Sequence, residues 1–325
     1  MNKANWKHVL HYDPLPVLLS SHNEAIAFFT AKDLLGKVLD TKSLWDLPEA
    51  QKIVRAQQPN GSWKYPGGNN AIRSAENYDQ IETYRNLGYL VEMFGFDKTS
   101  PVVARAAEFM FRFQTDAGDI RGILGNQYTP YYTAGILELL IKAGYAGDKR
   151  VEAAFKWLAS IRQNDGGWAI PLRTRGKKLD VIAMGNATLE PDRSKPFSHL
   201  VTGMVLRAYA ADEKYRSALV AKTAADLLLT RLFKKDEYSD RGSADFWVRF
   251  TYPFWFTDLV SATDSLSKLG FSKDEPHMQK AVQWFIDAQQ KDGAWKLKTL
   301  KNGKKYPTDL WLDLAICRIL QRLYK

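Results

Sequence analysis

The sequence has only one cysteine, Cys317, among 325 residues. One thiol excludes an intramolecular disulfide and any paired-cysteine metal motif. Long apolar runs are lacking too, because no stretch approaches the roughly 18 uncharged residues that a membrane span needs. Residues 1–21 contain no continuous apolar segment followed by a small-residue cleavage site, so they do not resemble a secretion signal. We therefore expect a cytoplasmic protein, with residues 1–21 forming an N-terminal arm that packs on the main fold.

The sequence also lacks the ligand patterns of a metal site. Cys317 lies between Ile316 and Arg318 in a helical stretch, where a thiol usually packs in the core. The sequence predicts no metal and no cofactor, because no ligand spacing is found among its five histidines, which are His8, His11, His22, His199 and His277.

The net charge of +10 narrows the classes of partner. Such an excess fits an anionic partner, for example a diphosphate or a membrane surface, and it equally serves solubility. The lysines and arginines are scattered, apart from the runs at 173–178 and 297–305. No compact basic stripe or reading helix is evident, so nucleic-acid binding is not expected. Peripheral membrane association remains open, and no obligate protein partner is evident.

What the sequence does contain is a recurrent turn that ends in tryptophan. It reads QQPNGSW at 57–63, RQNDGGW at 162–168 and QQKDGAW at 289–295, with a degenerate copy at Gln114. Glycine supplies positive φ in such turns, while Asn or Asp bonds its own backbone. Each turn closes a segment in which apolar residues recur at helical spacing. The repeating unit is therefore helix, short turn, helix and glycine-tryptophan loop.

Paired helices of this kind fill most of the chain, and no alternating strand pattern is convincing. The pairs are expected at 78–120, 130–168, 197–233 and 252–295, with flanking helices at about 22–35, 46–57 and 308–324. Repeats of helix pairs bury their apolar faces against neighbouring repeats. The last helix is apolar on more than one side, which favours closure into a ring over an open array. We expect a single domain over residues 1–325.

The Gln and Gly-x-Trp pattern resembles the QW motif of squalene and oxidosqualene cyclases, which is related to the repeats of protein prenyltransferase β subunits. Residues 13–36 also resemble the N-terminal segment of prokaryotic prenyltransferase/squalene-oxidase-repeat proteins. The resemblance implies an all-α fold, an α/α toroid of inner and outer helices, (α/α)6-like. In such a fold, Gln57, Gln163 and Gln289 would bond backbone groups at a neighbouring helix terminus. The three motif tryptophans would fill the space between repeats.

The resemblance also indicates where a ligand would bind. The helix after each Gly-x-Trp loop would line an inner barrel, with its N-terminal end at the mouth of a cavity. These helices are expected to start near Tyr78, Pro130, Phe197, Pro253 and Thr308. Aligning four of them puts Thr83, Tyr132, Leu200 and Asp258 in one tier, and Glu82, Tyr131, His199 and Thr257 in the next. The candidate lining residues are His199, Tyr132, Tyr131, Thr83, Trp255, Phe256, Thr257, Arg249 and Trp311.

Asp258 is the candidate catalytic residue. Class II terpenoid cyclases protonate an alkene with an aspartate of a DxDD motif, and the matching stretch here is 255–258, where only the last carboxylate is present. The third position is Thr257, whose hydroxyl is too weak an acid for this step. An aspartate facing a cavity has its pKa raised by desolvation, whereas one in a first helical turn needs no role beyond stabilising the helix dipole.

Three functions remain open. A cavity rich in aromatic rings suits an isoprenoid, which a terpene cyclase or isomerase would transform. The same toroid without catalysis would bind a hydrophobic ligand or a protein. A carbohydrate-active α/α barrel would need paired carboxylates, which could come from Asp79, Glu82, Asp258 and Asp309. The DDxxD run of magnesium-dependent ionisation is missing, and the single cysteine argues against the zinc site of prenyltransferases.

Overall fold

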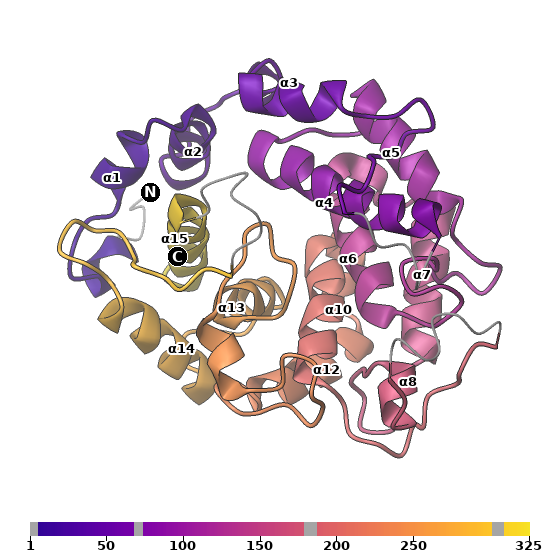
Figure 1. Ribbon diagram of the computed structural model, residues 1–325. Helices are drawn as coiled ribbons and strands as arrows, with labels where there is room; N and C mark the ends of the chain where they lie inside the picture. Colours follow the sequence, from indigo (N-terminus) through magenta and orange to yellow (C-terminus); the bar gives the residue numbers. More distant parts are fainter. Residues whose placement is uncertain (1–5, 68–73, 179–186, 301–308) are drawn as a thin grey trace. The chain divides into compact units, whose positions relative to one another are not determined.

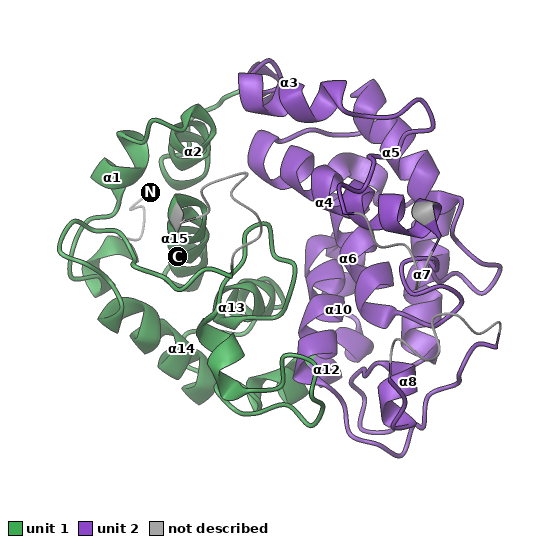
Figure 2. Ribbon diagram, viewed as in Figure 1, with its two compact units in different colours: residues 1–40, 225–325 green, residues 41–224 purple. Residues whose placement is uncertain are grey.

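The computed structural model describes residues 6–67, 74–178, 187–300 and 309–325, and its regular elements are helices (Figure 1). This part of the chain contains isolated β-bridges but no strand. The prediction of an all-α fold of paired helices is therefore confirmed. None of the described helices is long and apolar enough to cross a membrane. The chain divides into two compact units, residues 1–40 with 225–325 and residues 41–224 (Figure 2).

In the unit of residues 41–224, inner and outer helices alternate along the sequence. Its inner helices α4, α6 and α10 pack one against the next, and α5 and α7 cover α4 and α6 respectively. The elements are η3 (Thr41–Leu44), α3 (Pro48–Arg55), α4 (Ala75–Phe94), α5 (Pro101–Phe111), α6 (Pro130–Leu140), η4 (Ile141–Tyr145), α7 (Lys149–Ser160), α8 (Pro171–Thr174), α10 (His199–Ala211), α11 (Glu213–Arg216) and the start of α12 (Leu219–Leu229).

The unit of residues 1–40 and 225–325 brings the first and last helices of the sequence together. Here α15 packs against α13 on one side and against η1, α1 and η2 on the other. The elements are η1 (Trp6–Val9), α1 (Leu15–Leu19), α2 (Glu24–Phe29), η2 (Thr30–Leu34), η5 (Ala244–Val248), α13 (Leu259–Lys268), α14 (Pro276–Asp287) and α15 (Asp309–Leu323). Apolar residues of α15 are buried on more than one side, as its sequence predicts.

Local signals explain where these helices begin and end. Prolines occupy the first turns of α3, α5, α6 and α14, where the missing N–H removes no intrahelical bond. Ser198 caps α10 by accepting from the N–H of Val201. Gly95, at φ 63°, ends α4 in the left-handed conformation. One start differs from expectation: α13 begins at Leu259, six residues after Pro253, because Asp258 caps the helix there.

The recurrent turns have the same internal geometry. The indole Nε1 of each motif tryptophan donates to the carbonyl ten residues earlier at 2.7 Å, from Trp63 to Ile53, from Trp168 to Leu158 and from Trp295 to Phe285. The motif glutamines donate to backbone carbonyls of another repeat, as Gln57 Nε2 does to Val102 O at 2.8 Å. Gln114 Nε2 does the same to Arg150 O at 2.8 Å. Gln163 Nε2 differs, because it donates to the loop carbonyls of Asp192 at 2.8 Å and Lys195 at 2.9 Å. The predicted contact with a neighbouring helix terminus is thus found for Gln57, and Gln163 clamps a loop instead.

Four of the inner helices, α4, α6, α10 and α15, bind a preceding loop through one polar side chain. The hydroxyls of Thr83, Thr133 and Thr202 accept from the backbone N–H of Trp63, Ile120 and Trp168 at 3.0, 3.1 and 2.9 Å. Asp313 accepts from the N–H of Trp295 at 3.3 Å in the same way. These contacts correct the alignment of the tiers, since Thr83 corresponds to Thr133 and Thr202 rather than to Tyr132 and Leu200.

Candidate functional site

The partly exposed aromatic side chains of the inner helices lie at the start of α6. Tyr131 and Tyr132 are half-buried, and their ring centroids are 4.4 Å apart. The ring of Tyr132 lies edge-on to the buried ring of Tyr84 on α4, at 6.1 Å between centroids and 87° between planes. Edge-to-face pairs of this kind are favoured by the ring quadrupoles. Two of the predicted lining residues, Tyr131 and Tyr132, therefore lie together on α6, and Tyr84 of the neighbouring helix α4 packs behind them.

A glycine inside α6 makes room for Tyr84. A Cβ at Gly135 would lie 2.4 Å from the Tyr84 hydroxyl oxygen. Glycine in a helix interior costs about 1 kcal/mol relative to alanine, and Gly135 adopts no left-handed conformation that would require it. The close approach of the tyrosine therefore explains this residue. Burial raises the pKa of Tyr84, against the opposing effect of Arg207, so its hydroxyl is a neutral hydrogen-bonding group at physiological pH.

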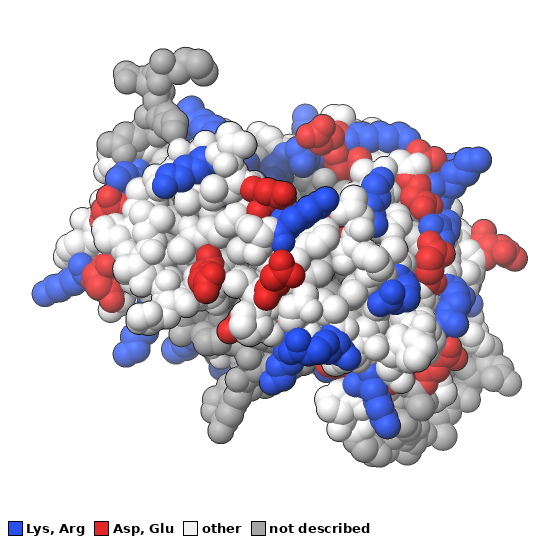
Figure 3. Space-filling model, turned by 90° about the horizontal axis from the view of Figure 1, so that it is seen from above, with Lys and Arg blue, Asp and Glu red and all other residues white. Residues whose placement is uncertain are grey.

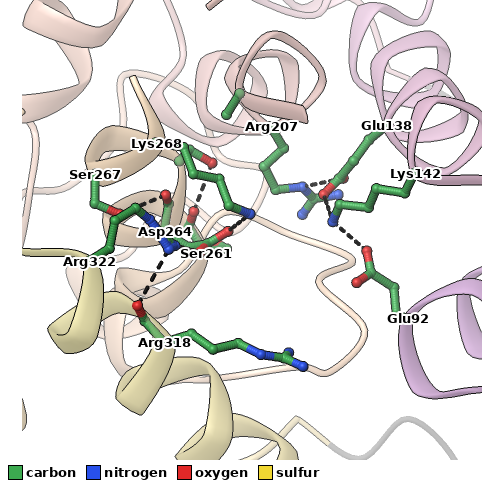
Figure 4. A network of polar contacts seen from close by, with 12 residues as sticks. Glu92, Glu138, Lys142, Arg207, Ser261, Asp264, Ser267, Lys268, Arg318 and Arg322 are labelled. Atoms are coloured by element: carbon green, nitrogen blue, oxygen red, sulfur yellow. Dashed lines mark hydrogen bonds and ion pairs between the residues drawn. The ribbon is translucent and has the colours of Figure 1, made fainter. Parts of the chain in front are cut away.

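A buried ion network joins α4, α6 and α10 beyond this tyrosine (Figure 4). Arg207 Nε lies 2.8 Å from a Glu138 carboxylate oxygen, and their side chains are only 3% and 5% exposed. Lys142 Nζ lies 2.7 Å from the other Glu138 oxygen and 2.5 Å from Glu92. Two cations and two carboxylates make the group neutral. Buried ion pairs are expensive to form and strongly destabilising to break, so this network fixes how the three helices pack.

The carboxylates keep both cations charged. Burial lowers the pKa of Lys142, but Glu138 and Glu92 outweigh it and raise that pKa above its usual value. Burial likewise opposes the charge of Arg207, and Glu138 restores it, so the pKa of this residue is also raised. Neither group is therefore a proton donor near neutral pH. The site offers aromatic faces, neutral hydroxyls and a fixed, compensated charge pattern.

The remaining predicted residues of this unit have structural contacts. The Thr83 hydroxyl accepts from Trp63 N and donates to Asp79 O at 2.7 Å, so it holds the loop. His199 is the first residue of α10 and is buried. Asp79 accepts from Tyr65 N at 2.8 Å and from Gln58 Nε2 at 3.1 Å. Its carboxylate serves local structure instead of a sugar-cleaving pair.

In the other unit, Asp258 is the N-cap of α13. Its Oδ1 accepts from Ser261 N at 2.8 Å, while its own N–H donates to the Ser261 hydroxyl at 2.9 Å, which completes a capping box. Asp258 as a whole is 1% exposed. Ser261 and Ser265, which follow Asp258 one and two turns along the helix, are buried as well, each 1% exposed.

The neighbours of Asp258 in the sequence are mostly packed residues. Trp255 and Thr257 are buried, and Phe256 lies under the guanidinium of Arg241 at 3.5 Å. Trp311 is fully buried and stacks on Tyr252, with centroids 5.4 Å apart and planes 7° apart. Arg249 is largely exposed and lies 3.9 Å from Asp245. The prediction that Arg249 lines a ligand cavity gains no support from this ion pair.

Sequence reasoning missed the ion network and the aromatic-cation contact of Arg241. Glu138 and Lys142 are four residues apart in an otherwise apolar stretch, and that spacing is a signal for a buried charge pair. Their partner Arg207 is 69 residues further on, a separation that no local pattern reveals. Asp264 forms a second network with Lys268 at 2.7 Å and Arg322 at 2.6 Å (Figure 4). On the face seen in Figure 3, acidic and basic side chains are interspersed, with no stripe of one sign.

The comparisons with known proteins point to the resemblance already carried by the motifs. The family model described as squalene-hopene cyclase C-terminal domain matches residues 80–188, about a third of the chain. No curated protein matches the sequence.

Among solved structures, a protein from Actinoplanes is 15% identical, with 96% of this chain and 88% of that chain covered and a TM-score of 0.43. A type II terpene cyclase from Scytonema, with its product merosterolic acid A, is 13% identical over 87% and 97%, with a TM-score of 0.41. A polysaccharide lyase is 14% identical over 100% and 98%, with a TM-score of 0.46. The stretch from α4 to α8, which contains Tyr131, Tyr132 and Glu138, is thus similar in sequence to the C-terminal domain of squalene-hopene cyclases.

Proposed function

We propose that the chain binds a hydrophobic, isoprenoid-like small molecule on the aromatic face at the start of α6. The observation that carries this proposal is the pair of half-buried rings, Tyr131 and Tyr132, backed by Tyr84. Aromatic faces bind apolar chains and attract positive charge through their quadrupoles. Supporting evidence comes from the family match, because these residues lie within the stretch similar to squalene-hopene cyclases.

The ion network gives this face a rigid support. Glu138 links Arg207 of α10 to Lys142 at the end of the α6 region, so the three inner helices are held in one register. A site on helices locked by packing and hydrogen bonds positions a ligand more precisely than one on loops. The hydroxyl of Tyr84 is buried and neutral, so it adds polarity without adding charge.

The test is binding of farnesol to the purified full chain, followed by intrinsic fluorescence or calorimetry. Tyr132→Ala should weaken binding about tenfold, because burying apolar ligand surface against a partly exposed ring contributes about 1–2 kcal/mol. Tyr132→Phe should keep most of the affinity, since the ring face remains. The matched control is Tyr145→Ala, because Tyr145 is also half-buried but contacts Phe111 on α5 instead. Equal affinities for all variants, or no binding by the wild type, would reject the proposal.

A second proposal concerns turnover. Asp258, which belongs to the other unit, would act as an acid on an isoprenoid-like molecule bound within that unit, and the observation in its favour is the near-complete burial of this residue. The capping box opposes this role, because it occupies Oδ1 with a structural hydrogen bond from Ser261 N. We therefore place binding first. The carbohydrate alternative is less supported, since Asp79 is occupied by backbone and amide donors and Glu82 pairs with Arg85 at 3.4 Å. The side chain of Asp309 lies outside the described residues.

A further inference from the structure

The last Gly-x-Trp turn, at 289–295, binds the N-terminal segment of the chain instead of a following repeat. In earlier repeats, Gln57 and Gln114 donate to the first turn of the next outer helix along the chain. Gln289 instead donates from Nε2 to Tyr12 O at 2.8 Å, and Tyr12 N donates to Gln289 Oε1 at 3.1 Å. The two residues are 277 positions apart. The N-terminal segment thus occupies the place that a following repeat would take.

The glycine of the same turn supports this equivalence. A Cβ at Gly293 would lie 2.4 Å from the carbonyl oxygen of Asp13. A Cβ at Gly118 would likewise lie 2.4 Å from the carbonyl oxygen of Ala153. Ala153 belongs to α7, which is the next outer helix along the chain. Each glycine also has a positive φ, of 90° and 106°. The last loop therefore contacts residues 12–13 as an earlier loop contacts a helix.

Further contacts extend this junction along α15. Arg318 Nε lies 2.8 Å from Asp33, and Gln321 Nε2 donates to Leu34 O at 3.1 Å. The ring of Phe29 lies edge-on to Trp311 at 5.9 Å. Residues 6–35 thereby complete a compact unit with residues 225–325, although residues 41–224 separate them in the chain and form the other unit.

The link that follows this segment is exposed. Residues 36–38 are all exposed, and Val38 is fully so. Residues 6–35 complete a part of the chain that is distant in sequence, and an exposed link joins them to the residues that follow. Such a segment can make the same contacts with a second copy. The exchanged form needs no new contacts, because Gln289, Gly293 and Arg318 would contact the same residues, Tyr12, Asp13 and Asp33, of the second copy. Only chain connectivity changes.

We propose that residues 6–35 exchange between two copies of this chain, so that the surface formed by α15 and the 289–295 loop is a self-recognition surface. Its partner is the N-terminal segment of a second copy. This interaction is independent of any ligand at the tyrosines of α6.

The test uses charge reversal across the ion pair of Asp33 and Arg318 in two full-length variants. Asp33→Arg alone and Arg318→Asp alone each place like charges at the junction within one chain. When the two variants are mixed, reciprocal exchange pairs opposite charges at both junctions. We expect a 1:1 heterodimer by native mass spectrometry and light scattering, formed only in the mixture. The control is the double reversal in one chain, which restores the internal pair and should show the same distribution of monomer and exchanged dimer as the wild type.

A mixture that stays monomeric while the double-reversal control folds would overturn the proposal. If a single variant does not fold, wild-type chains carrying two different tags are refolded together at high concentration and captured through one tag. Retention of the second tag supports exchange, and Gln114→Ala, which lies outside the junction, should leave that retention unchanged. Absence of the second tag, or its loss with Gln114→Ala, overturns the proposal.

Discussion

At the scale of single residues, several polar side chains of the inner helices serve the backbone first. Thr83, Thr133 and Thr202 each bind the loop before their helix, and Asp313 does so in the last repeat. A buried N–H without a partner costs about 1–3 kcal/mol, so one such side chain per repeat is well explained by structure. A carboxylate accepts this bond but, when ionised, cannot donate to the loop carbonyl as Thr133 does to Ile120 O.

Asp258 allows the capping role to be separated from an acidic role. Asparagine caps helices about as well as aspartate, whereas alanine costs about 1 kcal/mol and up to about 2. We expect Asp258→Asn to change the free energy of unfolding by less than about 0.5 kcal/mol, and Asp258→Ala to lower it by about 1–2 kcal/mol. Urea denaturation of both variants measures this. Turnover lost in Asp258→Asn at unchanged stability would establish the acid, and equal destabilisation by both variants would contradict the capping account.

At the scale of elements, the sequence predicted the helix pairs because apolar periodicity and proline or glycine boundaries are local signals. The starts of α6 and α15 were predicted to within one residue, at Pro130 and near Thr308. The tiers of the inner helices were not. The threonine that binds the loop is the ninth residue of α4 but the fourth residue of α6 and of α10, so no single alignment of helix boundaries brings the three to one level. Register depends on contacts such as Thr133 with Ile120, which no helix-end signal encodes.

The pairing of α4 with α6 gives a prediction of its own. Replacing a helix-interior glycine by alanine normally stabilises a protein by about 1 kcal/mol. Gly135→Ala should instead destabilise this one, because the new Cβ would overlap the Tyr84 hydroxyl. Tyr84→Phe removes that oxygen, so the alanine should cost less in the double variant. A double-mutant cycle from thermal unfolding measures the coupling, and additive effects would show that the two side chains do not meet.

At the scale of the whole molecule, each unit contains its own buried charge network, the one around Glu138 and the one around Asp264. Sequence periodicity cannot reveal either network, because each carboxylate has a partner on another helix. Glu138 pairs with Arg207, and Asp264 pairs with Arg322. Periodicity does reveal the apolar faces that surround them. The repeats therefore specify which helices exist, and the networks specify how neighbouring helices are aligned within a unit.

The network around Asp264 predicts how the molecule responds to acid. Burial opposes the charge of this carboxyl, but Lys268 and Arg322 outweigh it and hold its pKa well below the usual range. A carboxylate whose pKa is lowered by folding stabilises the native state above its unfolded pKa of about 3.9, and this contribution is lost as the pH falls below that value. Meanwhile the net charge of +10 rises as the other acidic groups are neutralised, toward the full charge of 46 lysines and arginines.

We therefore expect Asp264→Asn to lower the free energy of unfolding by about 2 kcal/mol at pH 7, where it removes an ionised partner of two cations. The difference from wild type should be constant from pH 7 to about 5 and should shrink below about pH 4, because the wild-type carboxylate is then progressively lost as well. Urea unfolding at a series of pH values measures both curves. The matched control is Asp226→Asn, on the outer helix α12, which involves no such network among the described contacts. A difference that grows as the pH falls would mean that Asp264 is not held ionised by Lys268 and Arg322.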